Sequence, residues 1–408
     1  MVETALVSSL SYTYHSATED DYDEMCSFDG RAFGEAWRPE GQAAMKALID
    51  FDRFMLVRSG SELVGVSGCF SQELTVPGGA QIAAGGVTWV AVSPTQRRRG
   101  LLTEMMNRLH VQSAERGEPL TMLTASEGGI YDRFGYGVAT HWRVLRIDRR
   151  QAQLRDEFVP VHPLDGGAEI RLTDMTDTSL PDIYDRYRRQ RVGEIRRTAA
   201  YFELQRVNRG TGVVTAIHPD GYACWKIEPK WNAGHPEHEL ELFDLIAVTP
   251  EAHAALWHTV LSVDLIGPII GYNSFAVDDA LPYLLDNPRA ARTTNLNDML
   301  WIRIDDVRSA LGARTYGTDD VLVVELADVD GGTRWKVDGS PMGATVQKVR
   351  SKPDVVTDRA SLGALYLGGV RASTLNAGQR LVARNADVLR RADHFFAADR
   401  MPHCATGF

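Results

Sequence analysis

The sequence has few cysteines, no long apolar run and no excess of basic residues. Its four cysteines are scattered over 408 residues without a Cys-x-x-Cys pair, which is typical of free thiols in a reducing compartment. No apolar run reaches the roughly 20 residues that span a bilayer. The first residues do not combine a charged start with a following apolar region, so we expect no signal peptide. The net charge of −10 disfavours a general nucleic-acid binder and suits a cationic partner. We therefore expect a cytoplasmic protein with no membrane span and no nucleic-acid partner.

The most informative stretch of the chain covers residues 86–137. Val87–Val92 is a short, β-branched apolar run, which is typical of a strand buried on both faces. Three arginines and Gly100 follow, and apolar residues from Leu102 onward then recur at helical spacing. This order directs backbone N–H groups and a positive helix end toward an anion. Because cations at a helix N-terminus oppose the macrodipole unless an anion is bound, the stretch predicts a pyrophosphate site rather than a solvated basic cluster.

The motifs in this stretch distinguish among phosphate-binding folds. No Gly-Lys-Ser/Thr follows the loop and no Gly-x-Gly-x-x-Gly is present, which excludes a Walker A loop and a dinucleotide fingerprint. The loop Arg97-Arg-Arg-Gly-Leu-Leu102 resembles the Q/R-x-x-G-x-G/A loop that binds the pyrophosphate of acetyl-CoA in GNAT acetyltransferases, with leucine where the last Gly or Ala is usual. Tyr131, Gly135 and Tyr136 match the Tyr-x-x-x-Gly-Tyr/Phe element of the same enzymes. With Ala-Ser-Glu-Gly-Gly-Ile before that tyrosine, the chain resembles the Eis (enhanced intracellular survival) family of actinobacteria over nearly its whole length.

A degenerate internal repeat points to a second domain of the same kind. Ala247-Val-Thr-Pro250 repeats Ala91-Val-Ser-Pro94, and each segment ends an apolar strand and precedes a helical pattern. The second copy continues with Glu251-Ala-His, where the first copy has its arginine loop. Without those arginines the second copy should not bind coenzyme A.

The resemblance implies an α/β and α+β chain of two tandem GNAT-like domains, the second degenerate, followed by a sterol-carrier-protein-like α+β domain. We expect the catalytic GNAT domain in residues 1–150, with a strand at 142–147 as its last element. The degenerate domain is expected in residues 168–296. The third domain is expected in residues 297–408, with a strand at 299–304 as its first element.

Carried over residue by residue, the resemblance assigns a cofactor site and a substrate pocket. The acetyl-CoA site would comprise a strand edge, the arginine loop and the turn after the next strand: Val90, Ala91, Val92, Arg97, Arg98, Arg99, Gly100, Leu101, Leu102, Thr103, Ser126 and Glu127. The pocket for a cationic amine would comprise acidic and aromatic side chains: Glu35, Trp37, Trp89 and Asp298. Solvated surface acids and core tryptophans are the alternative for the pocket residues.

Tyr131 and Phe408 are the expected catalytic residues. A tyrosine with its usual pKa of about 10 is protonated at neutral pH, so Tyr131 can donate a proton to the departing thiolate; the alternative is a core aromatic in a Gly-rich turn. The resemblance points to the terminal carboxylate of Phe408 as the base, although chain ends are more often disordered. Gly407 stands where family members carry an acidic residue. His110 is expected to be structural, and His235-Pro-Glu-His238 lacks the further ligands of a metal site.

The activity that the resemblance implies is N-acetylation by direct transfer in a ternary complex. Acetyl-CoA would be the cosubstrate, and the reaction needs no metal. The acceptors would be primary amines of polyamino compounds such as aminoglycosides, at more than one position, and the family assembles as a hexamer. Two alternatives stay open: a protein lysine N-acetyltransferase, and a non-catalytic lipid- or CoA-binding protein in which the loop is a relic.

Overall fold

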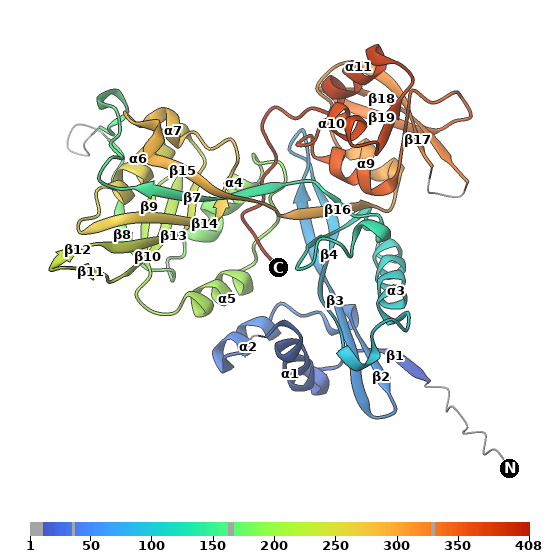
Figure 1. Ribbon diagram of the computed structural model, residues 1–408, viewed down its shortest axis with the longest axis horizontal. Coiled ribbons are helices and arrows are strands. Elements are labelled where there is room, and N and C mark those ends of the chain that lie inside the picture. Colours follow the sequence, from blue (N-terminus) through green and yellow to red (C-terminus); the bar gives the residue numbers. More distant parts are fainter. Residues whose placement is uncertain (1–10, 35–36, 162–166, 328–330) are drawn as a thin grey trace.

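The computed structural model describes residues 11–34, 37–161, 167–327 and 331–408. These residues form two seven-stranded sheets, one five-stranded sheet and a two-stranded hairpin. The chain end lies between the two larger sheets (Figure 1). Among the residues so described, no helix has both the length and the apolar character to cross a bilayer.

The first sheet is built from the N-terminal part of the chain and one strand from much later. Its strands, in spatial order, are β1 (Tyr12–Ser16), β2 (Phe54–Ser59), β3 (Glu62–Thr75), β4 (Gln81–Val92), β5 (Leu120–Thr124), β16 (Leu300–Ile304) and β6 (Gly137–Val138). β4 and β5 are parallel, and the other neighbours are antiparallel. The helices between β1 and β2, and then between β4 and β5, are α1 (Tyr22–Phe33), α2 (Pro39–Lys46) and α3 (Leu101–Glu115).

The second sheet repeats this arrangement. Its strands, in the corresponding order, are β8 (Arg171–Thr173), β9 (Val214–His218), β10 (Gly221–Glu228), β13 (His238–Ala247), β14 (Ile266–Phe275), β7 (His141–Asp148) and β15 (Ala291–Asp298). β13 and β14 are the parallel pair here. The helices in the equivalent connections are α4 (Leu180–Arg188), α5 (Ala199–Arg209) and α6 (Pro250–Leu261). The topology therefore confirms the internal repeat that the sequence predicts. The hairpin β11 (Trp231–Asn232) and β12 (His235–Pro236) lies between β10 and β13, and α7 (Leu281–Leu284) follows β14.

Two strands, β7 and β16, lie in a different sheet from the one that the expected domain boundaries predict. We expected the strand at 142–147 to close the first domain, but β7 pairs with β14 and β15 in the second sheet. We expected the strand at 299–304 to open the third domain, but β16 pairs with β5 and β6 in the first sheet. The apolar pattern of each segment predicts a strand but not its partner. The chain therefore passes from one sheet to the other twice, at 139–140 and at Met299.

The third domain is an α+β unit that packs on the first sheet. Its strands, in spatial order, are β19 (Gly343–Lys348), β18 (Thr333–Ser340), β17 (Asp320–Leu326), β20 (Val355–Thr357) and β21 (Leu381–Ala383). Its helices are α8 (Val307–Ala313), α9 (Arg359–Tyr366), α10 (Ala372–Ala377) and α11 (Ala386–Phe396). One continuous hydrophobic cluster joins Leu300 and Ile302 of β16 to Leu362 and Leu365 of α9. The third domain is thereby fixed to the edge of the first sheet (Figure 1).

Helix α9 lies directly on the backbone of β16 and β6. A Cβ atom on Gly363 would lie 2.0 Å from the carbonyl oxygen of Ile302, and one on Gly137 would lie 1.8 Å from the carbonyl oxygen of Ala360. No side chain fits at either distance. Glycine at both positions is therefore what allows the helix to approach the strand edge so closely.

We expect Gly363→Ala to lower the free energy of unfolding by about 2 kcal/mol or more, because the new Cβ must push α9 away from β16. Gly312→Ala is the matched control, since Gly312 lies in α8 and a Cβ there meets no neighbour within 4 Å. Alanine's helix propensity should leave this control as stable as the wild type, or more stable by about 1 kcal/mol at most. Chemical denaturation measures both variants, and equal stabilities would contradict the close approach.

Candidate functional site

The centre of the site is an opening between two parallel strands. The ladder between β4 and β5 joins Gly85 to Thr121 and Gly86 to Met122. Beyond Gly86, β4 continues to Val92 paired with β3, and its register shifts around Trp89, whose φ is 53°. The predicted residues Val90, Ala91 and Val92 lie on this continuation. Their backbone edge toward β5 is therefore available to a ligand that forms strand-like hydrogen bonds.

The arginine loop and the N-terminus of α3 form a site for an anion beside this opening. Gly100 precedes the helix with φ of 84°, and no side chain caps the helix. The first α-helical bond runs from the Glu104 N–H to the Gly100 carbonyl, at 3.0 Å, so the N–H groups of Leu101, Leu102 and Thr103 have no partner within the helix. Arg97, Arg98 and Arg99 are exposed. Three N–H groups and a helix dipole thus face the same side as the arginines.

The three arginines differ in their partners. Arg99 donates from Nη1 to the Tyr12 hydroxyl at 3.2 Å, and that hydroxyl donates to Gln96 Oε1 at 2.8 Å. Arg97 and Arg98 form no ion pair with any other residue that the structure describes. Arg98 also has a positive φ of 63°, which a non-glycine residue rarely adopts. Two guanidinium groups are therefore left available for an anionic ligand.

The equivalent position in the second domain is closed to an anion. Thr249 caps α6, and its hydroxyl oxygen accepts a hydrogen bond from the Ala252 N–H at 3.2 Å. Pro250 occupies the first position of that helix and has no N–H. Thr249 thus caps the helix itself, and no arginine loop is present. The second copy therefore lacks the anion site of the first.

Tyr131 follows β5 in the chain and lies just before the short 3₁₀ helix Asp132–Phe134. It is 9% exposed, and its ring makes an edge contact with Tyr136 at 6.1 Å. Burial raises the pKa of Tyr131, and the neighbouring charge of Glu127 raises it further. The hydroxyl bonds to no other described residue. Tyr131 is therefore protonated at neutral pH with its proton uncommitted. Ser126 and Glu127 follow β5 in an exposed turn.

Tyr136 and His110 have structural roles. The Tyr136 hydroxyl donates to Thr121 Oγ1 at 2.9 Å and lies 3.0 Å from His110 Nε2. Burial, followed by the charges of Arg303 and Arg359, lowers the pKa of His110 to about 3. A buried histidine with so low a pKa is a weak base and stays neutral near neutral pH.

The two predicted pocket tryptophans lie together, beside a carboxyl group that the sequence analysis missed. The rings of Trp37 and Trp89 lie 5.5 Å apart. Trp37 Nε1 donates to Asp29 Oδ2 at 3.0 Å, and Asp29 is 7% exposed. Asp29 lies on α1 at helical spacing from the buried Met25 and Cys26. A charged residue on an otherwise apolar helix face was the signal that could have found it.

The other two predicted pocket residues, Glu35 and Asp298, do not lie in the described contact between Trp37 and Trp89. Glu35 lies outside the described residues. Asp298 is exposed at the end of β15, and its Oδ2 accepts a hydrogen bond from Trp301 Nε1 at 2.6 Å. Trp301 belongs to the apolar cluster that contains Tyr131. Asp298 therefore binds an aromatic residue of the cluster that contains Tyr131, and its place in the amine pocket stays a prediction.

The chain end reaches the point where β4 and β5 separate. A Cβ atom on Gly86, the last residue of β4 that pairs with β5, would lie 3.0 Å from Cε2 of Phe408. The terminal carboxyl oxygen of Phe408 accepts a hydrogen bond from Thr124 Oγ1 at 3.3 Å. The Phe408 ring packs against two hydrophobic clusters, one of which contains Trp89. The Phe408 ring thus holds residue 408 where β4 and β5 separate.

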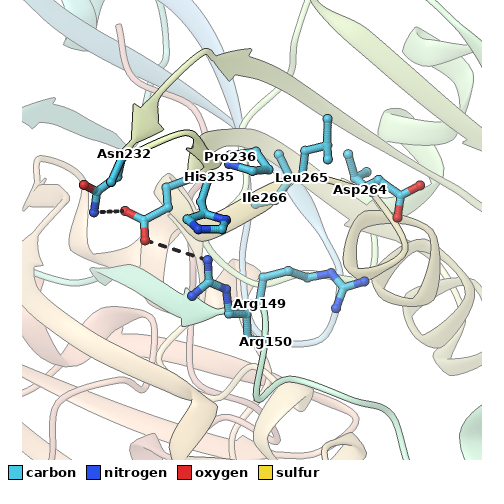
Figure 2. Close-up of a pocket in the computed structure, with 11 residues that line it drawn as sticks. Arg149, Arg150, Asn232, His235, Pro236, Asp264, Leu265 and Ile266 are labelled. Carbon is cyan, nitrogen blue, oxygen red and sulfur yellow. Dashed lines mark hydrogen bonds and ion pairs between the residues drawn. The ribbon is translucent and has the colours of Figure 1, made fainter.

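A separate pocket of about 560 Å³ lies in the second domain, beside the hairpin β11–β12. Asn232 and Arg150 lie on its polar rim (Figure 2). Glu237 accepts a hydrogen bond from Asn232 at 3.3 Å and pairs with Arg150 at 3.7 Å. This pocket is at the amino ends of β13 and β14, whereas the opening in the first domain is at the carboxyl ends of the equivalent strands. His235 is among its lining residues. No group of three or more potential metal-ligating side chains occurs in the part of the chain that the structure describes.

Comparison with protein families assigns all three parts of the chain. Two models described as "Acetyltransferase (GNAT) domain" match residues 13–139 and 193–304. A model described as "Sterol carrier protein domain" matches residues 307–405. The predicted fold class, two GNAT domains followed by a sterol-carrier-like domain, is confirmed. GNAT domains use acetyl-CoA.

Whole-length relatives agree with these matches. The N-acetyltransferase Eis of Mycobacterium tuberculosis is 36% identical over 405 residues, which cover 96% of this chain and 98% of the relative. An uncharacterized N-acetyltransferase of Streptomyces avermitilis is 33% identical over 399 residues, or 93% of this chain and 95% of the relative. The crystal structure of Eis1 from Mycobacterium abscessus superposes with a TM-score of 0.85 at 30% identity, covering 98% of this chain and all of that one.

We expect the double variant Arg97→Ala/Arg98→Ala to bind CoA at least tenfold more weakly than the wild type, because each charge-assisted hydrogen bond contributes about 1.5–3 kcal/mol. Isothermal titration calorimetry at two salt concentrations measures the loss. Arg116→Ala is the control, since Arg116 lies at the opposite end of α3 and pairs with Asp50 at 3.6 Å. Unchanged CoA affinity in the double variant would place the anion site elsewhere.

Proposed function

Since this chain belongs to the Eis family of GNAT-type N-acetyltransferases, we propose that it acetylates primary amines of polyamino compounds such as aminoglycosides, at more than one position. One observation carries the proposal: the terminal carboxylate of Phe408 lies at the mouth of the strand opening, beside Thr124. A base, a proton donor and a cofactor groove then surround one space. The protein would act in the cytoplasm and, like its family, as a hexamer.

The chain's own residues supply the groups that direct transfer requires. The arginine loop and the N-terminus of α3 hold the pyrophosphate, and the edge of Val90–Val92 aligns the pantetheine arm so that the thioester lies between β4 and β5. The acceptor nitrogen attacks the thioester carbon, and the C–S bond breaks. Phe408 takes a proton from the amine through its carboxylate, and Tyr131 gives one to the departing thiolate. No acyl-enzyme forms.

The acceptor side favours a cation. Trp37 is partly exposed and would offer an aromatic face to an ammonium group, while the buried Trp89 supports its ring. The Asp29 carboxyl group lies next to Trp37. The terminal carboxyl group of Phe408 would add a second acidic group, since the Phe408 ring packs against the cluster that contains Trp89. The net charge of −10 favours the approach of polycations over the whole surface.

The test of the activity is thiol release from acetyl-CoA with a multi-amine aminoglycoside, followed by mass spectrometry of the acceptor. We expect CoA release and more than one acetyl group per acceptor molecule. A single acetylation on a lysine peptide, without any on the aminoglycoside, would instead favour a protein acetyltransferase. Bound CoA without release to any amine would favour a non-catalytic binder.

We expect Tyr131→Phe to lower kcat at least 100-fold while leaving the affinity for acetyl-CoA within about twofold, because general acid catalysis contributes about 10²–10⁴. Tyr136→Phe is the comparison, since that hydroxyl bonds to Thr121 and lies beside His110. It should cost about 1 kcal/mol of stability and retain most of the activity. Loss of cofactor binding in Tyr131→Phe would assign Tyr131 a structural role.

We expect a peptide tag added after Phe408 to reduce acetyl transfer at least 100-fold, because the terminal carboxylate becomes an amide and the new chain must leave the site. Acetyl-CoA binding should persist. The same tag at the N-terminus is the control, and proteolytic removal of the C-terminal tag back to Phe408 should restore activity. Full activity of the C-terminally tagged protein would remove the carboxylate from the mechanism.

A further inference from the structure

The repeated topology defines, in the second domain, the counterpart of the acceptor side of the first. In the first domain, the connection between α1 and α2 carries Trp37, which packs against Trp89 of β4. In the second domain, the connection between α4 and α5 covers residues 189–198 and faces β13, the strand equivalent to β4. If the second domain retained an acceptor pocket, it would lie between that connection and β13.

The chain's own C-terminal segment occupies this place. The His403 N–H donates to the Val192 carbonyl at 2.8 Å, and the Ala405 N–H donates to Glu194 Oε1 at 3.0 Å. The Ala405 side chain is buried in an apolar cluster that includes Phe243 of β13. The segment therefore binds along the α4–α5 connection by main-chain hydrogen bonds and fills the apolar space beside β13.

Arg197 fixes the next residue of the segment. Its Nε donates to Thr406 Oγ1 at 2.8 Å, and its Nη2 donates to the Ala405 carbonyl at 3.1 Å. Asp244 of β13 holds the same guanidinium group through Nη1, at 2.9 Å. The Thr406 hydroxyl also lies 2.9 Å from that of Tyr184. The Arg197 guanidinium group thus binds both the main chain and the Thr406 side chain of the tail.

The three side chains that hold the tail, those of Glu194, Arg197 and Tyr184, are buried. Glu194 is fully buried, and its Oε2 accepts a hydrogen bond from the Tyr184 hydroxyl at 2.8 Å. Burial raises the pKa of Glu194 to about 7, against the opposing charge of Arg197. Burying an acid and an arginine is costly unless both are well hydrogen-bonded, and here the tail supplies some of those bonds. The arrangement therefore favours this segment in one register.

The register matters because the chain ends two residues later. Tyr201 of α5 donates to the Gly407 carbonyl at 3.3 Å, and the Phe408 carboxylate then meets Thr124. A slip by one residue would move the carboxylate by about 3.3 Å. Such a displacement is enough to separate a base from the proton that it must take.

We propose that the acceptor pocket of the degenerate GNAT domain has become a binding site for the chain's own C-terminal segment, with Glu194 and Arg197 as positioning residues that hold the terminal carboxylate in the active site of the first domain. The positioning role rests on the proposed function of that carboxylate. The occupancy of the pocket does not.

The test uses the full chain with Thr406→Val, which removes the hydroxyl that Arg197 and Tyr184 bind at nearly constant shape. Thr215→Val is the matched control, because Thr215 is a buried threonine of the same domain whose hydroxyl lies near Cys224, not the tail. Thr406→Ser restores the hydroxyl. The first readout, release of Phe408 by carboxypeptidase followed by intact mass, needs no acetyltransferase activity. The second is the kcat and KM of acetyl transfer.

We expect Thr406→Val to release Phe408 at least tenfold faster than Thr215→Val, and its kcat to fall at least tenfold with the KM for acetyl-CoA unchanged. Thr406→Ser should recover both values. Equal release from Thr406→Val and Thr215→Val would overturn the tail site. Faster release with an unchanged kcat would overturn the positioning role and contradict the proposed base, and would leave the pocket occupied by the tail.

Discussion

The antiparallel pairing of β16 with β5 is the contact on which the rest of the structure depends. It joins Leu300–Ile304 to Leu120–Thr124 residue by residue, so a strand from the last third of the chain completes the sheet of the first domain. Helix α9 packs on β16 and on the neighbouring strand β6 through glycine. The third domain is consequently fixed relative to the first sheet. After its last helix, α11, the C-terminal segment runs back between the two GNAT sheets (Figure 1).

The three domains contribute separately to one site. The first supplies the strand opening, an uncapped helix with free arginines, and a buried tyrosine. The second has lost these features, since Thr249 caps its equivalent helix, but its α4–α5 connection holds the tail through Glu194 and Arg197. The third supports the edge of the first sheet beside Tyr131, where Arg380 pairs with Asp132 at 2.9 Å. The second domain, which lacks the arginine loop, thus binds part of its own chain.

The sequence predicted the local parts of this arrangement better than the distant ones. The strand, arginine loop and α3 are contiguous, so their apolar spacing and the glycine define them without tertiary information. The partners of β7 and β16 could not be predicted, because an apolar strand pattern fits either sheet. Asp29 was missed, although a charge among buried residues of α1 marked it. Asp298 hydrogen-bonds to Trp301, a contact that could not be predicted because it depends on the exchange of strands.

The central claim is that the terminal carboxylate is the base, and replacing that group alone tests it most directly. Cys404 allows a synthetic Cys404–Phe408 segment to be ligated to the rest of the chain, ending either in the native carboxylate or in a carboxamide of the same shape. We predict that the amide protein binds acetyl-CoA as the carboxylate protein does, while its kcat falls at least 100-fold, in the range of about 10²–10⁴ that a general base contributes. Equal kcat values for the two ligation products would contradict the account.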